Sequence, residues 1–148
     1  MQTSPPKVVA IIPARYHSNR FEGKPLAHIM GRPMIQHVVE RARQVALLSR
    51  VVVATDDERI AGAVRSFGGE VVLTRPDHAT GTDRLAEAAS LIDISEQDII
   101  VNIQGDQPLF PAEVVTQVAG PMLEDPALPM ATLIYKIVRP EEINDPNH

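Results

Sequence analysis

The chain has 148 residues and a mass of 16.2 kDa, enough for one domain with a hydrophobic core and too few for two. Apolar residues make up 44% and charged residues 22%, and the net charge is -5; this balance argues against disorder and against nucleic-acid binding by bulk charge. Cysteine is absent, which excludes thiolate chemistry and fits a reducing cytoplasm. The N-terminal apolar run is only about six residues long, so we expect neither a signal peptide nor a membrane span.

The first predicted element is a strand. Residues 7–12 form a continuous β-branched run closed by Pro13, which is typical of a strand buried on both faces. A long loop is expected over 13–33, where prolines, glycines and basic residues alternate. A helix is predicted to begin at Pro33, because apolar residues follow at helical spacing: Met34, Ile35, Val38, Val39, Ala42, Val45 and Ala46.

Strands and helices alternate through the rest of the chain. Strands are predicted over 50–55, 70–73, 98–103 and 130–138. Two of the intervening helices have capping residues, Asp56 and Asp57 for the first and Thr80 with Asp83 for the second. Their expected inward-facing residues are Ile60, Ala63, Val64 and Phe67, then Leu85, Ala88, Ala89 and Ile92. A further amphipathic segment is expected from Pro111 through about Leu123, interrupted by Gly120 and Pro121.

Buried strands joined by helices predict a mainly parallel sheet, because parallel strands need long crossover connections. We therefore expect a Rossmann-like, three-layer α/β/α domain that comprises the whole chain, 1–148. In such sheets, ligands bind at the carboxyl ends of the strands, near the point where the strand order reverses. The loops that follow the first and fourth strands are therefore the first places to seek a site.

The loop after the first strand carries three cations, Arg15, Arg20 and Lys24. Guanidinium and ammonium groups bind phosphate oxygens, and Gly23 permits a close backbone approach. The loop lacks a G-x-G-x-x-G motif, and Pro25 follows Lys24 where a Walker A loop needs serine or threonine. The residues therefore indicate either a phosphate-binding loop of another kind or a solvated basic loop.

Gln104, Gly105 and Asp106 follow the predicted strand at 98–103. A carboxylate at a strand end suits Mg²⁺, which combines one or two carboxylates with water and substrate phosphates. The alternative is an ordinary turn, since Gly-Asp and Pro108 are common turn residues.

The segment 74–84 is the third candidate. Gly81 permits a close approach, and the helix that begins with Thr82, Asp83 and Arg84 presents free amides to which a nucleobase or ribose can bind. The alternative is a capped helix start without a ligand. The five histidines show no metal-ligand spacing.

Four segments carry a family resemblance: VVAIIPARYHSNRFEGKPLAHIMGRPMIQHVVERA, VVVATDDERI, TRPDHATGTDRLAEAA and IIVNIQGDQPLFP. In this order they resemble the 3-deoxy-manno-octulosonate cytidylyltransferases, also called CMP-Kdo synthetases. The resemblance begins at about Val8, and HATGTDRLAEA favours this family over the sialic acid cytidylyltransferases. Phe21, Glu22 and Gln107 depart from the usual family residues.

The resemblance implies a cytoplasmic, homodimeric nucleotidyltransferase that uses Mg²⁺. It transfers a cytidylyl group from CTP to Kdo, giving CMP-Kdo and pyrophosphate for lipopolysaccharide synthesis. It also implies that the chain is the N-terminal part of the enzyme and that its single nucleotide-binding domain, 1–148, is incomplete, with an unpaired sheet edge and a tendency to associate. Neither nucleic acid nor membrane is an expected partner.

The resemblance also implies roles for individual residues. Arg15, Lys24 and Asp106 are the expected catalytic residues: Arg15 and Lys24 bind the triphosphate, and Asp106 is the magnesium ligand. The other expected contacts are assistance from Arg20, the backbone at Ala14, and a cytidine pocket formed by Gly81, Arg84 and Gln104. Two alternatives stay open: a catalytically dead nucleotide-binding fragment, and a cytidylyltransferase for another acidic sugar, such as 8-amino-Kdo or sialic acid.

Overall fold

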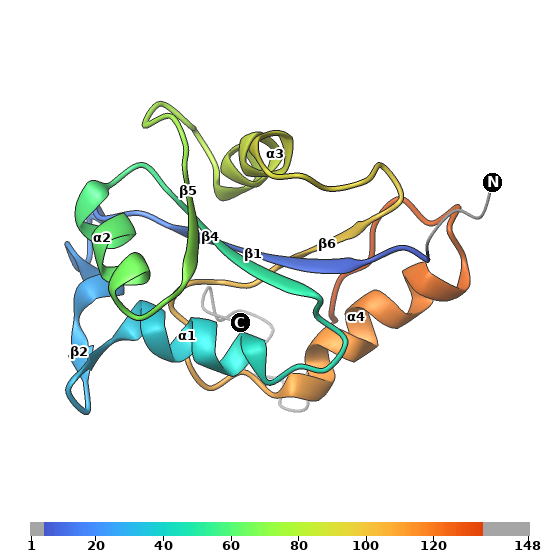
Figure 1. The fold of residues 1–148 in the computed structure, drawn as a ribbon, viewed down its shortest axis with the longest axis horizontal. Coiled ribbons are helices and arrows are strands. Elements are labelled where there is room, and N and C mark those ends of the chain that lie inside the picture. Colours follow the sequence, from blue (N-terminus) through green and yellow to red (C-terminus); the bar gives the residue numbers. More distant parts are fainter. Residues whose placement is uncertain (1–4, 135–148) are drawn as a thin grey trace, which may run out of the picture.

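A computed structural model describes residues 5–134 and contains a four-stranded parallel sheet in the order β5-β4-β1-β6 (Figure 1). The strands are β1 (Val8–Ala14), β4 (Arg50–Thr55), β5 (Glu70–Leu73) and β6 (Ile99–Asn102). A short antiparallel hairpin consists of β2 (His28–Ile29) and β3 (Arg32–Pro33). The helices are η1 (Lys24–Leu26), α1 (Met34–Arg43), α2 (Glu58–Ser66), α3 (Gly81–Leu91) and α4 (Ala112–Glu124).

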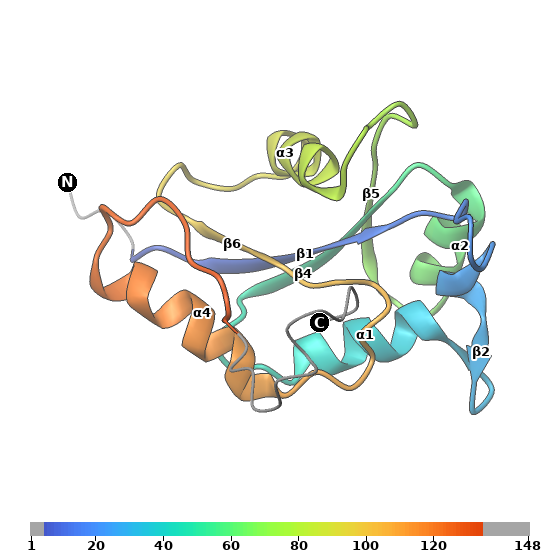
Figure 2. The same cartoon turned by 180° about the vertical axis from the view of Figure 1, so that it is seen from behind.

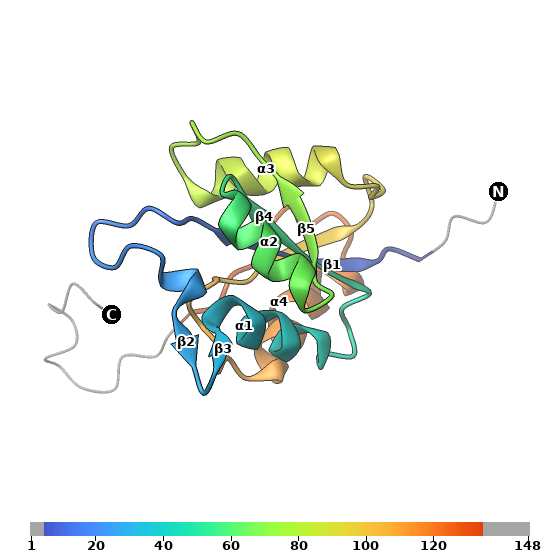
Figure 3. The same ribbon diagram turned by 60° about the vertical axis from the view of Figure 1, so that its left-hand side comes forward.

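The sheet lies between two helical layers, which confirms the three-layer prediction. Figures 1 and 2 show α3 on one face and α1 with α4 on the other. Side chains of β1 alternate accordingly: Ala10 and Ile12 join the larger core beneath α1, whereas Ile11 packs beneath α3 with Ala54 and Ala88. Figure 3 shows the hairpin beside the start of α1, where the Met34 amide donates to the carbonyl of Ala27 (2.8 Å).

The helix starts follow the predicted caps. Asp57 caps α2, because its carboxylate accepts a hydrogen bond from the Arg59 amide at 2.9 Å. Thr80 and Asp83 form the predicted capping box of α3, in which each side chain bonds to the other residue's backbone amide. These caps fix where each helix leaves the edge of the sheet.

The strand order reverses beside β1. The chain adds β4 and then β5 on one side of β1, and it returns to place β6 on the other side. The carboxyl ends of β1 and β6 therefore flank a switch point, the position at which open α/β sheets bind ligands.

Several predicted elements differ from the structure. The expected loop over 13–33 contains η1 and the β2–β3 hairpin, and α1 ends at Arg43, before Val45 and Ala46. The helix that begins after Pro111 continues through Gly120 and Pro121 to Glu124. Pro121 has no amide hydrogen to donate to the carbonyl four residues earlier, yet the helix continues for three residues beyond it. The strand predicted over 130–138 is not formed in its described part, 130–134, and its remainder lies outside the described residues. No helix in the described part of the chain is long and apolar enough to span a bilayer.

Candidate nucleotide-binding site

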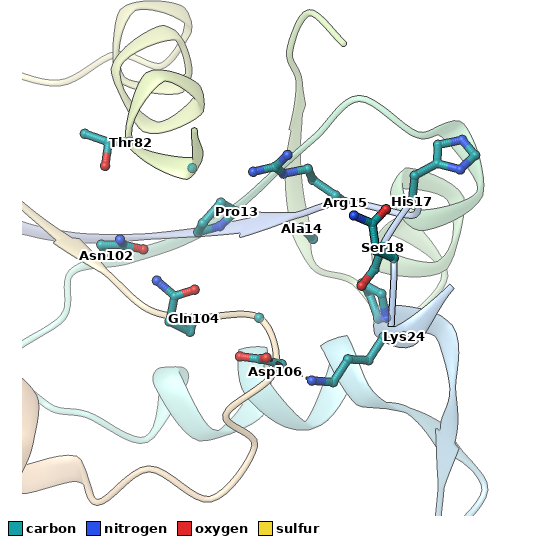
Figure 4. Close-up of a pocket in the computed structure, with 14 residues that line it drawn as sticks. Pro13, Ala14, Arg15, His17, Ser18, Lys24, Thr82, Asn102, Gln104 and Asp106 are labelled. Atoms are coloured by element: carbon teal, nitrogen blue, oxygen red, sulfur yellow. Dashed lines mark hydrogen bonds and ion pairs between the residues drawn. The ribbon is translucent and has the colours of Figure 1, made fainter. Parts of the chain in front are cut away.

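A cavity of about 550 Å³ opens at the carboxyl ends of β1 and β6 (Figure 4). It is bounded by the end of β1, the loop before η1, the start of α3 and the turn after β6. Its lining residues are Pro13, Ala14, Arg15, His17, Ser18, Asn19, Lys24, Pro25, Gly81, Thr82, Asn102, Gln104, Gly105 and Asp106. The cavity thus occupies the switch point that the topology predicts.

The end of β1 and the following loop provide the cationic side. Ala14 is buried in the sheet, whereas the next residue, Arg15, is exposed. In Figure 4, Arg15 extends toward the start of α3, away from Lys24. The cavity therefore holds two formal cations on different sides, against the single carboxylate of Asp106.

Lys24 and Asp106 point toward each other across the other side of the cavity (Figure 4). Lys24 Nζ donates to Asp106 Oδ2 at 2.9 Å, although 82 positions separate these residues in the chain. Their side chains are 41% and 51% exposed. An ion pair this accessible contributes at most about 1 kcal/mol, so phosphate and metal ions can compete for both groups.

Gly105 allows the turn after β6 to approach β1 closely. A Cβ atom at this position would lie 3.1 Å from the carbonyl oxygen of Pro13. The amide of Ile103 also donates to the carbonyl of Ile11 at 3.1 Å, which continues the β1–β6 pairing. Glycine at this position thus brings Gln104 and Asp106 to the cavity wall.

The start of α3 forms the opposite wall through Gly81 and Thr82. The capping-box hydrogen bonds from Thr80 hold the pKa of Asp83 below its ordinary value, so this carboxylate is ionised at neutral pH. The negative charge also suits the positive end of the helix.

Arg84 lies behind this wall and is fully buried, with 0% exposure. Its guanidinium donates to Thr74 Oγ1 at 2.5 Å and to Asp56 Oδ2 at 3.1 Å. Arg84 Nε has no hydrogen-bond partner within residues 5–134. Arg84 therefore ties α3 to the segments that follow β4 and β5, and its side chain does not line the cavity.

Most of the residues proposed from sequence converge on the cavity, namely Ala14, Arg15, Lys24, Gly81, Gln104 and Asp106. Arg20 and Arg84 are not among its lining residues. Sequence reasoning missed Asn102, whose signal is a polar residue that ends the apolar run of β6. It also missed His17, Ser18 and Asn19, which carry no recognisable spacing.

Among residues 5–134, Asp106 is the only carboxylate that lines the cavity. Within the described residues, no three histidine, aspartate or glutamate side chains lie close enough together to hold a metal ion. The donor set therefore suits Mg²⁺ that keeps water and substrate phosphates as its other ligands. It does not suit an all-protein metal cage.

Comparisons with known proteins agree with this geometry. The sequence profile described as cytidylyltransferase matches residues 9–148. The 3-deoxy-manno-octulosonate cytidylyltransferase of Syntrophus aciditrophicus is 57% identical over 95% of this chain, and that of Syntrophotalea carbinolica is 55% identical over 95%. This chain spans only 57% and 55% of the length of those two relatives.

A solved structure extends the comparison. A CMP:2-keto-3-deoxy-manno-octonic acid synthetase complexed with CTP superposes with a TM-score of 0.78 and 51% identity. The match covers 83% of this chain and 50% of that one.

Proposed function

The chain belongs to the cytidylyltransferase family, and we propose that it carries the nucleotide-binding part of an enzyme that transfers a cytidylyl group from CTP to Kdo. The observation that carries this proposal is the convergence of Arg15, Lys24 and Asp106 on one cavity at the switch point. The volume of this cavity suits a small-molecule ligand. The similar synthetase structure was solved with CTP.

In the proposed reaction, the anomeric hydroxyl oxygen of Kdo attacks the α-phosphorus of CTP. The bond between that phosphorus and the oxygen bridging to the β-phosphate breaks, pyrophosphate leaves, and the hydroxyl proton is released. Such a transfer depends on alignment and on stabilisation of negative charge. We assign Arg15 and Lys24 to the phosphates, with Arg20 assisting from the same loop.

Lys24 can change partner at low cost, because its bond to Asp106 is solvent-exposed. In the proposed complex, Lys24 would bind the outer phosphates and Asp106 would hold Mg²⁺. Bound there, Mg²⁺ would neutralise charge on the phosphate oxygens. The single carboxylate and the open cavity support this assignment.

We assign the cytidine to the space between Gly81 and Gln104, which lie on facing walls, with the backbone at Ala14 close to the nucleotide. Both walls offer polar groups, from the start of α3 and from the turn after β6. Arg84 contributes indirectly, since its buried hydrogen bonds hold α3 in place. The proposal also includes a cytoplasmic location and a homodimer.

A thermal melt with each of the four nucleoside triphosphates, with and without Mg²⁺, tests the proposal. A ligand that binds only the native state raises the melting temperature. At a concentration 100 times its Kd, it increases the free energy of unfolding by about 2.7 kcal/mol. We expect an upward shift with CTP that exceeds the shift with ATP, GTP or UTP. A cooperative transition that no nucleotide moves would contradict nucleotide binding.

A second candidate is nucleotide binding without sugar transfer. The observation that favours it is that this chain spans 57% of its relative's length. Measuring pyrophosphate release with CTP and Kdo, 8-amino-Kdo or sialic acid distinguishes the two candidate functions. Release with Kdo alone supports the first proposal, and release with another sugar reassigns the acceptor. A CTP-induced shift without release supports the second candidate.

A further inference from the structure

The loop that carries the proposed phosphate-binding cations is closed at its base by one hydrogen bond. The amide of Gly23 donates to the carbonyl of Tyr16 at 2.7 Å. Tyr16 directly follows Arg15, and Gly23 directly precedes Lys24. The bond therefore joins the two backbone positions beside the cations, while the intervening residues form the exposed loop.

The ring of Tyr16 packs against Gly23. A Cβ atom at Gly23 would lie 3.1 Å from Cε2 of that ring, and the glycine has a φ of 70°, a left-handed conformation that side chains disfavour. The backbone at the base of the loop is thus seated on the aromatic ring.

Arg59 of α2 covers the same ring. Its guanidinium carbon lies 3.3 Å from the centroid of the Tyr16 ring, within the range of a cation–π contact. The guanidinium is held by the Asp57 carboxylate, which accepts from Nε at 3.0 Å and from Nη2 at 2.6 Å. Because Asp57 also caps α2, the cation is fixed to the framework of the fold.

We propose that Tyr16 and Arg59 are positioning residues that set the separation of Arg15 and Lys24 by keeping the base of their loop closed. The chain of contacts runs from the Asp57 cap through Arg59 and Tyr16 to Gly23. This inference rests on the proposed function, because it assigns the loop's geometry to triphosphate binding. Neither residue touches the nucleotide in this role.

We call the contacts that join Asp57, Arg59, Tyr16 and Gly23 the clamp. Hydrogen exchange of the Gly23 amide tests it without any nucleotide. Arg59→Gln removes the cation that covers the ring, and Arg65→Gln is the matched control. Both arginines lie on α2, and their side chains are 55% and 54% exposed. Arg65 pairs with Glu58 at 3.2 Å instead. A cation–π contact of this exposure predicts exchange roughly two- to fivefold faster in Arg59→Gln and unchanged in Arg65→Gln. The amide of Val53, in the core strand β4, reports any global loss of stability.

A second pair of variants separates the ring from its hydroxyl group. Tyr16→Leu should accelerate hydrogen exchange at the Gly23 amide. Tyr16→Phe retains the ring, so its Gly23 amide should exchange at the same rate as in the unaltered chain. Unchanged Gly23 exchange in both Arg59→Gln and Tyr16→Leu would overturn the inference. Equal acceleration at Gly23 and Val53 would also overturn it, since the effect would then be global.

Affinities for CTP and CMP test the functional consequence. Arg59→Gln and Tyr16→Leu should weaken CTP roughly two- to fivefold, and CMP less, because Lys24 is assigned to the outer phosphates. Faster Gly23 exchange with unchanged CTP affinity would overturn the positioning role. If the unaltered chain binds neither nucleotide, the proposed function fails, and the Gly23 exchange rates still decide whether the clamp exists.

Discussion

Lys24 and Asp106 form an ion pair with 2.9 Å between Nζ and Oδ2, and neither side chain makes another hydrogen bond within residues 5–134. The pair joins η1 to the turn after β6, across the cavity. Because both side chains are about half exposed, the pair is weak and can exchange partners. Substitution of either residue therefore tests ligand binding with little effect on folding.

Asp106→Asn should abolish the Mg²⁺-dependent part of the CTP-induced thermal shift and, in the complete enzyme, turnover. The amide keeps the shape but lacks the charge that attracts the metal ion. The melting temperature without ligand should change little, since surface substitutions usually alter stability by less than about 0.5 kcal/mol. Asp77→Asn, at an exposed carboxylate outside this cavity, is the control. A retained Mg²⁺ effect would remove Asp106 from the metal site.

Lys24→Ala should weaken CTP roughly 10- to 100-fold, because a charge-assisted hydrogen bond contributes about 1.5–3 kcal/mol. CMP should be affected much less, since it lacks the outer phosphates. Isothermal titration with both nucleotides measures the difference. Lys7→Ala is the control, because Lys7 is an exposed lysine that does not line the cavity. Equal weakening of CTP and CMP would contradict the assignment to the outer phosphates.

Gly105→Ala should reduce CTP affinity roughly tenfold or more, because the added Cβ must displace the turn from Pro13 and with it Asp106. Gly62→Ala is the matched control: no atom lies within 4 Å of its added Cβ. That change lies within α2 and should stabilise the protein by about 0.5–1 kcal/mol. Unchanged CTP affinity in Gly105→Ala would show that the turn tolerates the displacement.

Arg84→Met should lower the free energy of unfolding by roughly 3–5 kcal/mol, because it leaves Asp56 without its buried partner. Chemical denaturation measures this loss. Arg75→Met, at a side chain that is 67% exposed, should cost far less. Similar losses in the two variants would argue against a structural role for the buried guanidinium.

Glu87→Gln should lower the melting temperature at pH 7 and matter progressively less in acid. A close contact with His78 and a 2.9 Å hydrogen bond from the Arg75 amide hold the pKa of Glu87 below its ordinary value. A lowered native pKa stabilises the folded state above the unfolded value of about 4.3, and this stabilisation disappears as the pH falls through the native pKa. Melts from pH 3 to 7 test this, with exposed Glu96→Gln as control. A difference independent of pH would contradict it.

Local patterns predicted much of the framework. The β-branched runs gave the observed bounds of β4 and β5, and Thr80 with Asp83 marked the start of α3, because these signals depend only on neighbouring residues. Pro121 misled the prediction of α4, because an interruption was expected at this proline and the helix continues through it to Glu124.

Contacts between distant segments were beyond such patterns. Lys24 and Asp106 were each singled out, but their hydrogen bond depends on how η1 and the turn after β6 meet. Arg84 was expected in the cytidine pocket because of the family resemblance. Its burial follows from Asp56 and Thr74, which only the sheet order brings to it.

The two faces of the sheet carry unequal amounts of apolar packing. Beneath α3 the fully buried apolar residues are Ile11, Ala54 and Ala88, whereas a much larger cluster fills the side of α1. Apolar packing alone would make α3 the first layer to detach in local unfolding, and the buried hydrogen bonds of Arg84 oppose this detachment. Gly81 would leave with α3 and open one wall of the cavity. A nucleotide that bridges Gly81 and Asp106 would therefore add a second link between α3, which has little apolar packing and depends on Arg84, and the larger core on the side of α1.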